Sequence, residues 1–93
     1  MSVTVYVPSP LRGHAGGAAV VELEGAPGTV RETLDELFRL HPGLRDRVLT
    51  ERGRLREHVH LFLGSERLSP TEGFDTRLED GAELTILPAI SGG

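Results

Sequence analysis

The chain has 93 residues, of which 38% are hydrophobic and 26% are charged, and its formal net charge is −4 at pH 7. This composition predicts one small globular domain over residues 1–93, and the negative charge argues against nucleic-acid partners. No apolar run approaches the roughly 18 residues that cross a bilayer, and no basic and apolar leader begins the chain. We therefore expect a cytoplasmic protein with neither a nucleic-acid nor a membrane partner.

The absence of cysteine and lysine limits the kinds of reactive group and metal site that the chain can contain. The chain contains no cysteine, which excludes a disulfide framework, a thiol nucleophile, a Cys-ligated iron–sulfur cluster and a Cys-type zinc site. All ten basic residues are arginine. Codon bias is one explanation for the missing lysines. The other is that a carrier with an activated acyl terminus benefits from having no side-chain amine that could capture it.

The N-terminal segment predicts a β-hairpin. Residues 3–7 and residues 19–24 alternate apolar and polar side chains with the period of a strand. The segment 9–17 between them is rich in proline and glycine and predicts a long hairpin loop. Such glycines also occur in phosphate-binding loops, but here no helix follows them and no Lys-Ser/Thr completes a P-loop motif.

A helix is predicted after the hairpin. Thr29 and Glu32 have the spacing of a capping box, and the apolar residues that follow recur at helical intervals. Pro42-Gly43 ends this helix, residues 44–49 predict a short second helical turn, and the charged segment 50–57 predicts a mobile loop. The apolar stripe, which we expect to be core rather than a cofactor site, consists of Val30, Leu34, Leu37 and Phe38.

The second half of the chain returns to strands. Residues 58–63 alternate again, Gly64-Ser65 turns the chain into a short strand at residues 67–68, and Asp80-Gly81 leads into the last strand. This order predicts an α+β fold, a β-grasp roll in which one main helix covers a mixed sheet of about five strands. The expected core comprises Val5, Val21, Leu34, Phe38, Leu61 and Ile86.

Two histidines near the start of the third strand share one strand face. His58 and His60 could hold a metal ion only with a third ligand, and the sequence identifies none. We therefore expect solvated surface histidines and no metal site.

The chain is organised around its last ten residues, an apolar strand that ends in Gly92-Gly93. Pro88 has no N–H to donate, so regular strand pairing is expected to end there. Residues 88–93 then form an extended tail, in which the five residues 89–93 reach about 16–18 Å. Such a tail either threads into the active site of a partner, for which glycine has the thinnest backbone, or is a frayed chain end.

A second candidate site lies on the face of the sheet away from the helix. Phe62 and Leu87 have the parity opposite to Leu61 and Ile86, so both should project from the uncovered face. Two bulky apolar groups there predict a docking patch for a partner, to which we add Ile90 of the tail. The alternative is that Phe62 belongs to the core.

Together these features resemble the ubiquitin-like sulfur carriers of the ThiS/MoaD family, and the resemblance covers nearly the whole chain. Within that family the chain is most similar to the CysO branch, because of the loop Leu11-Arg12-Gly13-His14-Ala15-Gly16-Gly17. The sequence departs from the family at Gly64-Ser65, where these carriers often have Asn or Asp, so the turn type there is in doubt. The other matching features are the order of elements, the Thr29-capped helix, the Asp80-Gly81 turn and the ending at residues 84–93.

The resemblance implies a carrier protein rather than an enzyme, with no catalytic residue and no bound cofactor of its own. An E1-like partner of the MoeB/ThiF type would adenylate the Gly93 carboxylate with ATP, and sulfur transfer would then give a thiocarboxylate. Gly92 and Ser91 would thread the terminus into the partner. In the CysO branch the sulfur is passed to a pyridoxal-phosphate cysteine synthase, and a metal-dependent peptidase releases the cysteine.

Other functions remain open from the sequence. The same carrier could supply sulfur for molybdopterin, thiazole or 2-thiosugar formation, which the neighbouring genes would distinguish. It could instead be a ubiquitin-like modifier, recognised by amide-linked conjugates, or a binding module with an incidental Gly-Gly end.

Overall fold

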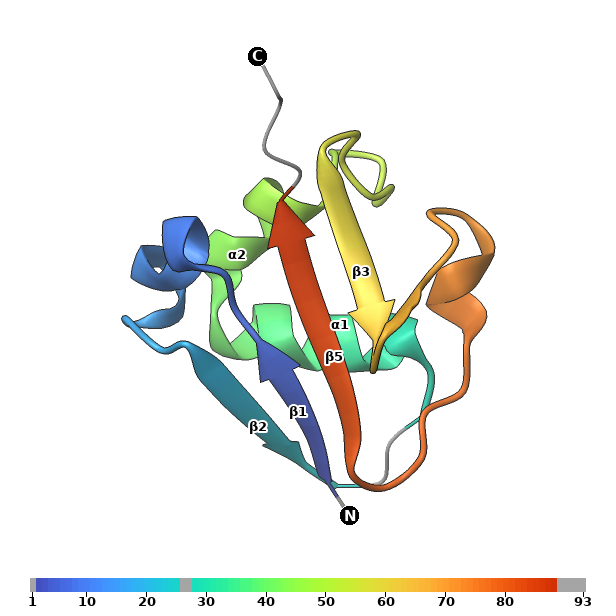
Figure 1. Ribbon diagram of the computed structural model, residues 1–93. Coiled ribbons are helices and arrows are strands. Elements are labelled where there is room, and N and C mark those ends of the chain that lie inside the picture. Colours follow the sequence, from blue (N-terminus) through green and yellow to red (C-terminus); the bar gives the residue numbers. More distant parts are fainter. Residues whose placement is uncertain (1, 26–27, 89–93) are drawn as a thin grey trace.

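The computed structural model describes residues 2–25 and 28–88 (Figure 1). Its elements in chain order are β1 (Ser2–Tyr6), the 3₁₀ helix η1 (Ser9–Ala15), β2 (Val20–Glu24), α1 (Val30–Leu40), α2 (Pro42–Val48), β3 (Val59–Leu63), β4 (Glu66–Arg67), the 3₁₀ helix η2 (Glu72–Asp75) and β5 (Ala82–Pro88). None of the described helices is long and apolar enough to span a membrane.

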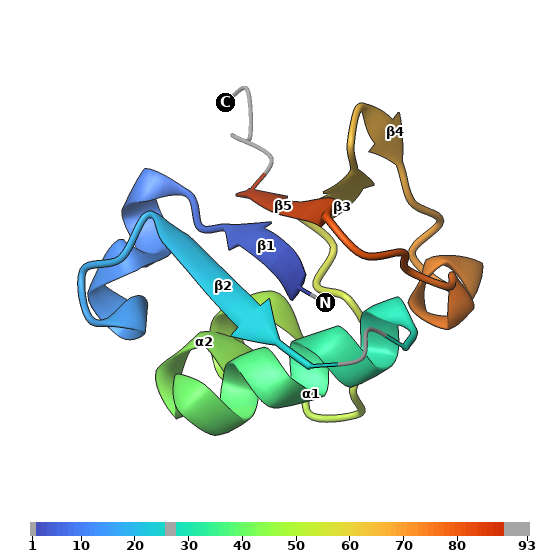
Figure 2. The same ribbon diagram turned by 90° about the horizontal axis from the view of Figure 1, so that it is seen from below.

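The five strands form one mixed sheet in the order β2-β1-β5-β3-β4. The central strand β5 runs parallel to its neighbour β1, and every other neighbouring pair of strands is antiparallel. Helices α1 and α2 lie on the same face of the sheet (Figure 2). This is the α+β, β-grasp arrangement that the sequence predicts, and it makes the last strand of the chain the centre of the sheet.

The predicted start of α1 is confirmed in detail. The N–H of Glu32 donates to the Thr29 hydroxyl at 3.2 Å, and the N–H of Thr29 donates to the Glu32 carboxylate at 3.0 Å. These reciprocal bonds satisfy two backbone donors that have no partner inside the helix. The predicted stripe of Val30, Leu34, Leu37 and Phe38 is buried, and the helix also buries Thr33.

The six predicted core residues are all buried, with relative exposures between 0% and 8%. The core also contains Phe74 and Leu78, for which the sequence predicted no packing role. Both lie in the connection between β4 and β5, where the short helix η2 turns Phe74 inward. A single turn of 3₁₀ helix has too few residues to produce a recognisable period.

The segment predicted as a plain hairpin loop contains the helix η1. The hairpin itself is confirmed, since β1 and β2 pair antiparallel. Leu11 N–H donates to the Pro8 carbonyl at 2.9 Å, Ala15 is buried, and Gly16 ends the turn with a left-handed φ of 66°. Such local i to i+3 bonds leave little trace in a hydrophobic pattern.

Pro42 ends α1 and at the same time begins α2. The cap between the two helices is His41, whose N–H donates to the Leu37 carbonyl at 2.8 Å. Proline is tolerated in a first helical turn because its missing N–H would have no partner there. The predicted short helical turn is therefore a seven-residue helix that buries Leu44 and Val48.

Two turns that contain glycine lie at strand ends of the sheet: Gly81 precedes β5, and Gly64 joins β3 to β4. Gly81 has a φ of 83°, and the neighbouring Asp80 carboxylate accepts the Ser2 N–H at 2.7 Å, which ties this turn to the start of β1. Gly64 and Ser65 are the two central residues of the turn between β3 and β4. Gly64 has a φ of 60°, whereas the φ of Ser65 is not positive. A positive φ at only the first central residue is typical of a type II′ hairpin turn, and this answers the question of turn type.

Candidate functional site

The central strand β5 presents different side chains to its two faces. Leu84 and Ile86 are fully buried under the helices, whereas Leu87 is 46% exposed. Because side chains alternate along a strand, Leu87 projects from the face of the sheet opposite α1 and α2. This confirms the predicted position of Leu87.

The neighbouring strand β3 adds an aromatic ring to the same face. Leu61 is buried on the helix side, while Phe62 is partly exposed and pairs with Thr85 of β5. Leu87 pairs with His60, so Phe62 is its diagonal neighbour, a relation that puts two residues on one face about 7–8 Å apart. The placement of Phe62 opposite the core side is as predicted.

Two further members of this surface, Tyr6 and Val20, were not predicted from the sequence. Tyr6 is 36% exposed and pairs with Val20 on one side and with Thr85 on the other. Val20 is 46% exposed. The strand alternation that located Phe62 is also present in residues 3–7 and 20–24, so it was the available signal for both.

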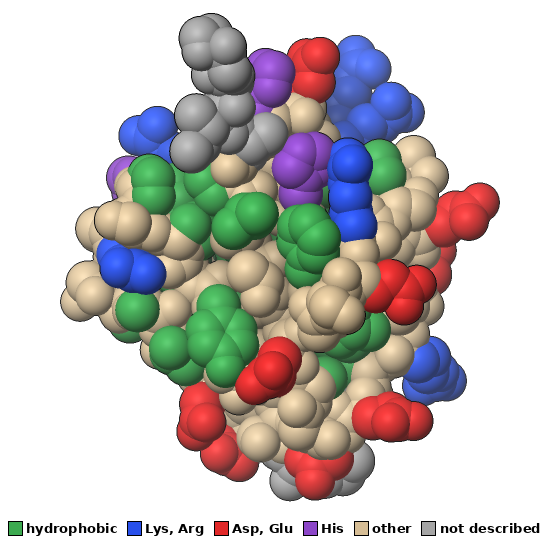
Figure 3. All heavy atoms as spheres, in the orientation of Figure 1, with side chains coloured by type: hydrophobic (Ala, Val, Ile, Leu, Met, Phe, Trp, Pro, Cys, Tyr) green, Lys and Arg blue, Asp and Glu red, His purple; other side chains and the backbone are tan. Residues whose placement is uncertain are grey.

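We call the exposed apolar surface formed by Tyr6, Val20, Phe62 and Leu87 the sheet-face patch. Figure 3 shows hydrophobic side chains gathered across this face of the molecule. These residues come from four strands, so the patch is held by the hydrogen-bonded ladder of the sheet rather than by a loop. A rigid apolar surface rimmed by polar groups is typical of a protein docking site.

One edge of the sheet-face patch is acidic. The hydroxyl of Tyr6 donates to the Glu83 carboxylate at 2.9 Å. This hydrogen bond and the negative charge of Glu83 raise the pKa of Tyr6 above its ordinary value. The phenol is therefore held in its neutral, donating form.

The Tyr6 hydroxyl gives a direct optical test of this geometry. Since Tyr6 is the only tyrosine and the chain has no tryptophan, phenolate absorbance reports this one group. In the folded protein its titration should occur at higher pH than in Glu83→Gln, because the substitution removes the negative charge that disfavours phenolate. The bond's contribution to stability is present below the unfolded pKa of Tyr6 and is lost as the pH rises through the raised folded pKa. Equal titration curves for the two proteins would contradict the observed bond.

The two histidines of the third strand region assemble no metal centre with the described residues. His58 is exposed and precedes β3, and His60 is partly exposed on the uncovered face. Within residues 2–25 and 28–88, no three His, Cys, Asp or Glu side chains lie close enough together to hold a metal ion.

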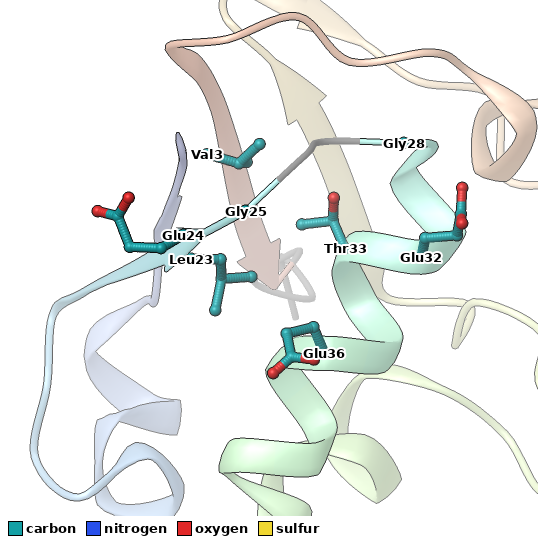
Figure 4. A pocket seen from close by; sticks show the side chains of 8 residues that line it. All are labelled: Val3, Leu23, Glu24, Gly25, Gly28, Glu32, Thr33 and Glu36. Carbon is teal, nitrogen blue, oxygen red and sulfur yellow. The ribbon is translucent and has the colours of Figure 1, made fainter. Parts of the chain in front are cut away.

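A shallow cavity of about 260 Å³ lies elsewhere, between β2 and α1 (Figure 4). Its polar lining includes Glu24, Glu32 and Glu36, and Glu32 is already engaged in the capping box of α1. Glu36 is also paired, and Arg39 lowers its pKa by a hydrogen bond. Two of the three carboxylates are thus already engaged in α1, and we assign the cavity no chemical role.

The predicted tail residues Ile90, Ser91, Gly92 and Gly93 lie outside the described residues. What the structure provides is the point from which they continue. Pro88 is the last residue of β5 and pairs with Val59 at the start of β3, beside the sheet-face patch.

The fold and the site therefore define a small ubiquitin-like β-grasp protein with an apolar sheet face next to the end of its central strand. The family model described as "ThiS family" matches residues 5–93, and the chain belongs to that family. This confirms the resemblance found in the sequence.

Known sulfur carrier proteins are similar to this chain over all or nearly all of its length. The sulfur carrier protein CysO of Mycobacterium tuberculosis is 33% identical, with 100% of both chains covered. In the crystal structure of the BexX/CysO complex of Amycolatopsis orientalis, the matching chain is 37% identical with a TM-score of 0.84, and the match covers 98% of this chain and 99% of that one.

The chain is also similar to a protein modifier. Small archaeal modifier protein 1 of Haloferax volcanii is 34% identical over 80 residues, which cover 85% of this chain and 86% of the relative. Its crystal structure has a TM-score of 0.84 at 28% identity, with 100% of both chains covered. These relatives are small ubiquitin-like proteins rather than enzymes, as the sequence predicted for this chain.

Proposed function

We propose that this protein is a sulfur carrier whose terminal Gly93 is the site of modification. The observation that carries the proposal is the full-length match to a sulfur carrier protein, with a family match that reaches Gly93. The geometry supports it, because β5 is held between β1 and β3 and ends at Pro88. The last five residues thus continue from an anchored strand.

The proposed chemistry has two steps, both performed by partners. An E1-like enzyme of the MoeB/ThiF type transfers the AMP group of ATP to the Gly93 carboxylate, and pyrophosphate leaves. A sulfur nucleophile then attacks the acyl carbon and AMP leaves, so one carboxylate oxygen is replaced by sulfur. The carrier itself binds no cofactor, and the consumption of ATP makes a cytoplasmic location part of the proposal.

For the downstream reaction we propose cysteine biosynthesis, in line with the similarity to CysO. The thiocarboxylate would attack an aminoacrylate held by a pyridoxal-phosphate synthase, and a metal-dependent peptidase would release the product. Sulfur donation to molybdopterin, thiazole or 2-thiosugar synthesis is the alternative within the family, and the genes beside this one would distinguish them.

Protein modification is a second candidate function, favoured by the similarity to small archaeal modifier protein 1. A modifier forms an amide bond between its terminal carboxyl group and an amine of its target. Amide-linked conjugates in lysates would support this role. A pool of free carrier with a sulfur-bearing terminus would instead support sulfur donation.

The test of the carrier function is activation by an E1-like enzyme. Wild-type protein should support exchange of pyrophosphate with ATP, because formation of the acyl adenylate is reversible. The absence of exchange with an enzyme that is competent on its own carrier would contradict the proposal.

We further propose that the sheet-face patch docks the activating enzyme. Phe62→Ala and Leu87→Ala should each raise the KM of exchange about tenfold, which corresponds to a hot-spot contribution of about 1.4 kcal/mol. The matched control is Leu40→Ala, because Leu40 is 45% exposed but lies on α1, on the other side of the sheet. That variant should exchange as the wild type does.

The stability of Phe62→Ala separates docking from packing. A docking residue should cost little free energy of unfolding when truncated, whereas removal of a core aromatic ring costs about 3–5 kcal/mol. A loss of that size would assign Phe62 to the core and remove it from the proposed docking site.

A further inference from the structure

The loop between α2 and β3 carries three arginines close to the end of the central strand. Arg52, Arg54 and Arg56 lie in this loop, and Arg47 lies in the last turn of α2. The N–H of Val59 donates to the Arg56 carbonyl at 3.0 Å, and Val59 is the residue that pairs with Pro88. The arginine loop, residues 50–56, is thus connected through Val59 to the point where β5 ends.

Backbone hydrogen bonds hold the arginine loop in one shape. Thr50 N–H donates to the Arg54 carbonyl at 2.7 Å, and Gly53 N–H donates back to the Thr50 carbonyl at 2.9 Å. Gly53 adopts a φ of 78°, which permits this tight turn, and Leu49 and Leu55 form a β-bridge below it. The positions from which these arginines project are therefore fixed by the fold.

No carboxylate of the described residues forms an ion pair with these arginines. The ion pairs of residues 2–25 and 28–88 are Arg31–Asp75, Arg39–Glu36 and Arg45–Asp46. The side chains of Arg47, Arg52, Arg54 and Arg56 are exposed and line two shallow depressions. Glu51 lines one depression and Asp46 the other, but neither carboxylate forms an ion pair with these four arginines.

The charge of the molecule is divided between its two ends. Residues 41–60 contain five arginines and three acidic residues, a formal charge of +2, whereas the rest of the chain contains five arginines and eleven acidic residues, a charge of −6. Figure 3 shows basic and histidine side chains mainly at the end of the molecule toward which β5 runs in Figure 1, and acidic side chains mainly at the opposite end. An acidic protein thus has a locally basic surface around the end of β5.

We propose that the arginine loop is an electrostatic docking element for an acidic protein surface that flanks the cleft receiving the C-terminal residues. This inference rests on the proposed function, because the partner is the activating enzyme. A divided charge orients an approaching partner: the basic end is attracted to an acidic rim, while the acidic end is repelled from it. The loop therefore supplies orientation, and the sheet-face patch supplies apolar contact.

The rest of the molecule disfavours nucleic acid as the occupant. The phosphates of a nucleic acid would be attracted by Arg52 and Arg54. They would be repelled by the carboxylates on the remaining surface, because the chain has a net charge of −4. An acidic protein rim can be small enough to face the arginine loop alone.

Charge reversal tests the proposal. The double variant Arg52→Glu/Arg54→Glu should raise the KM of ATP–pyrophosphate exchange about tenfold at low salt, with a smaller change in kcat. Arg52→Gln/Arg54→Gln should give an intermediate rise, since it removes attraction without adding repulsion. Both differences should shrink at about 1 M salt, where the Debye length falls to about 3 Å.

The matched control is Arg77→Glu, which changes the net charge by the same amount per site. Arg77 is exposed, has no ion pair within the described residues, and lies in the connection from η2 to β5, beside the Gly81 turn. It should leave KM unchanged. Thermal unfolding checks that all variants fold, because exposed substitutions of this kind change stability by at most about 0.5 kcal/mol.

Each outcome separates the docking inference from the carrier function. A double-reversal variant with the wild-type KM, or an Arg77→Glu effect of equal size, would overturn the arginine loop as a docking element while the carrier function stands. Binding of the wild type to a duplex oligonucleotide that the double reversal abolishes would assign the loop to nucleic acid instead. Wild-type protein that supports no exchange at all would overturn both proposals.

Discussion

Deletion of Gly93 should lower ATP–pyrophosphate exchange by a factor of about 100 or more, with the fold unchanged. Adenylation requires the acyl carbon at a fixed distance from the anchored end of β5, and a misplacement of about 1 Å costs on the order of 100-fold in rate. Gly92→Val should have a similar effect, because a β-branched side chain would widen a backbone that has to thread a narrow channel.

The stability of these tail variants should stay within about 0.5 kcal/mol of the wild type. The described core ends with Ile86, and both the deletion and the substitution lie beyond it in the sequence. Ile86→Ala is the contrasting variant from the same strand. Ile86 is fully buried, so its truncation should lower the free energy of unfolding by about 2–5 kcal/mol.

A tag gives a further control on the terminal site. A tag placed before Met1 should be tolerated, whereas an uncleaved tag after Gly93 should abolish exchange because it blocks the carboxylate. If the Gly93 deletion exchanges at the wild-type rate, the terminal glycines are not the site of activation and the proposal fails.

Much of the fold could be predicted from the sequence because long periodic segments dominate it. The capping box at Thr29 and Glu32, the apolar stripe of α1 and the alternation of β3 and β5 were each read correctly. The central position of β5 is a different matter, since strand order depends on pairing between distant segments. Only the β-grasp fold class was predicted, and the observed order β2-β1-β5-β3-β4 is what places β5 at the centre of the sheet.

The missed parts of the fold are short or depend on the tertiary structure. Helices η1 and η2 are too short for a period, so neither the role of η1 in the hairpin loop nor the burial of Phe74 could be predicted from spacing. Tyr6 and Val20 were not predicted, because the docking patch was inferred from the alternation of β3 and β5 alone. Their exposure becomes meaningful only once β1 and β2 are placed beside β5 and β3.

The arginine loop shows a further limit of sequence reasoning. A charged segment at residues 50–57 predicted only a loop, because nothing in the spacing relates it to the C-terminus. The pairing of Val59 with Pro88 is what brings its arginines to the end of β5.

The proposed modification replaces one oxygen atom of Gly93 by sulfur, and the mass of the protein measures this replacement directly. Incubation with an E1-like activating enzyme, ATP and a sulfide source should add about 16 Da to the wild-type chain, the difference between sulfur and oxygen after acyl activation. The Gly93 deletion should show no gain. In protein from native cells the same gain should be present on part of the pool.

The position of the gain has to be established, because oxidation of Met1, the only methionine, adds nearly the same mass. Cleavage after arginine releases residues 78–93 as one peptide, since Arg77 is the last basic residue of the chain. We expect the additional 16 Da or so on that peptide and none on the peptide that contains Met1. An unchanged mass of residues 78–93, with an enzyme that modifies its own carrier under the same conditions, would contradict the sulfur-carrier function.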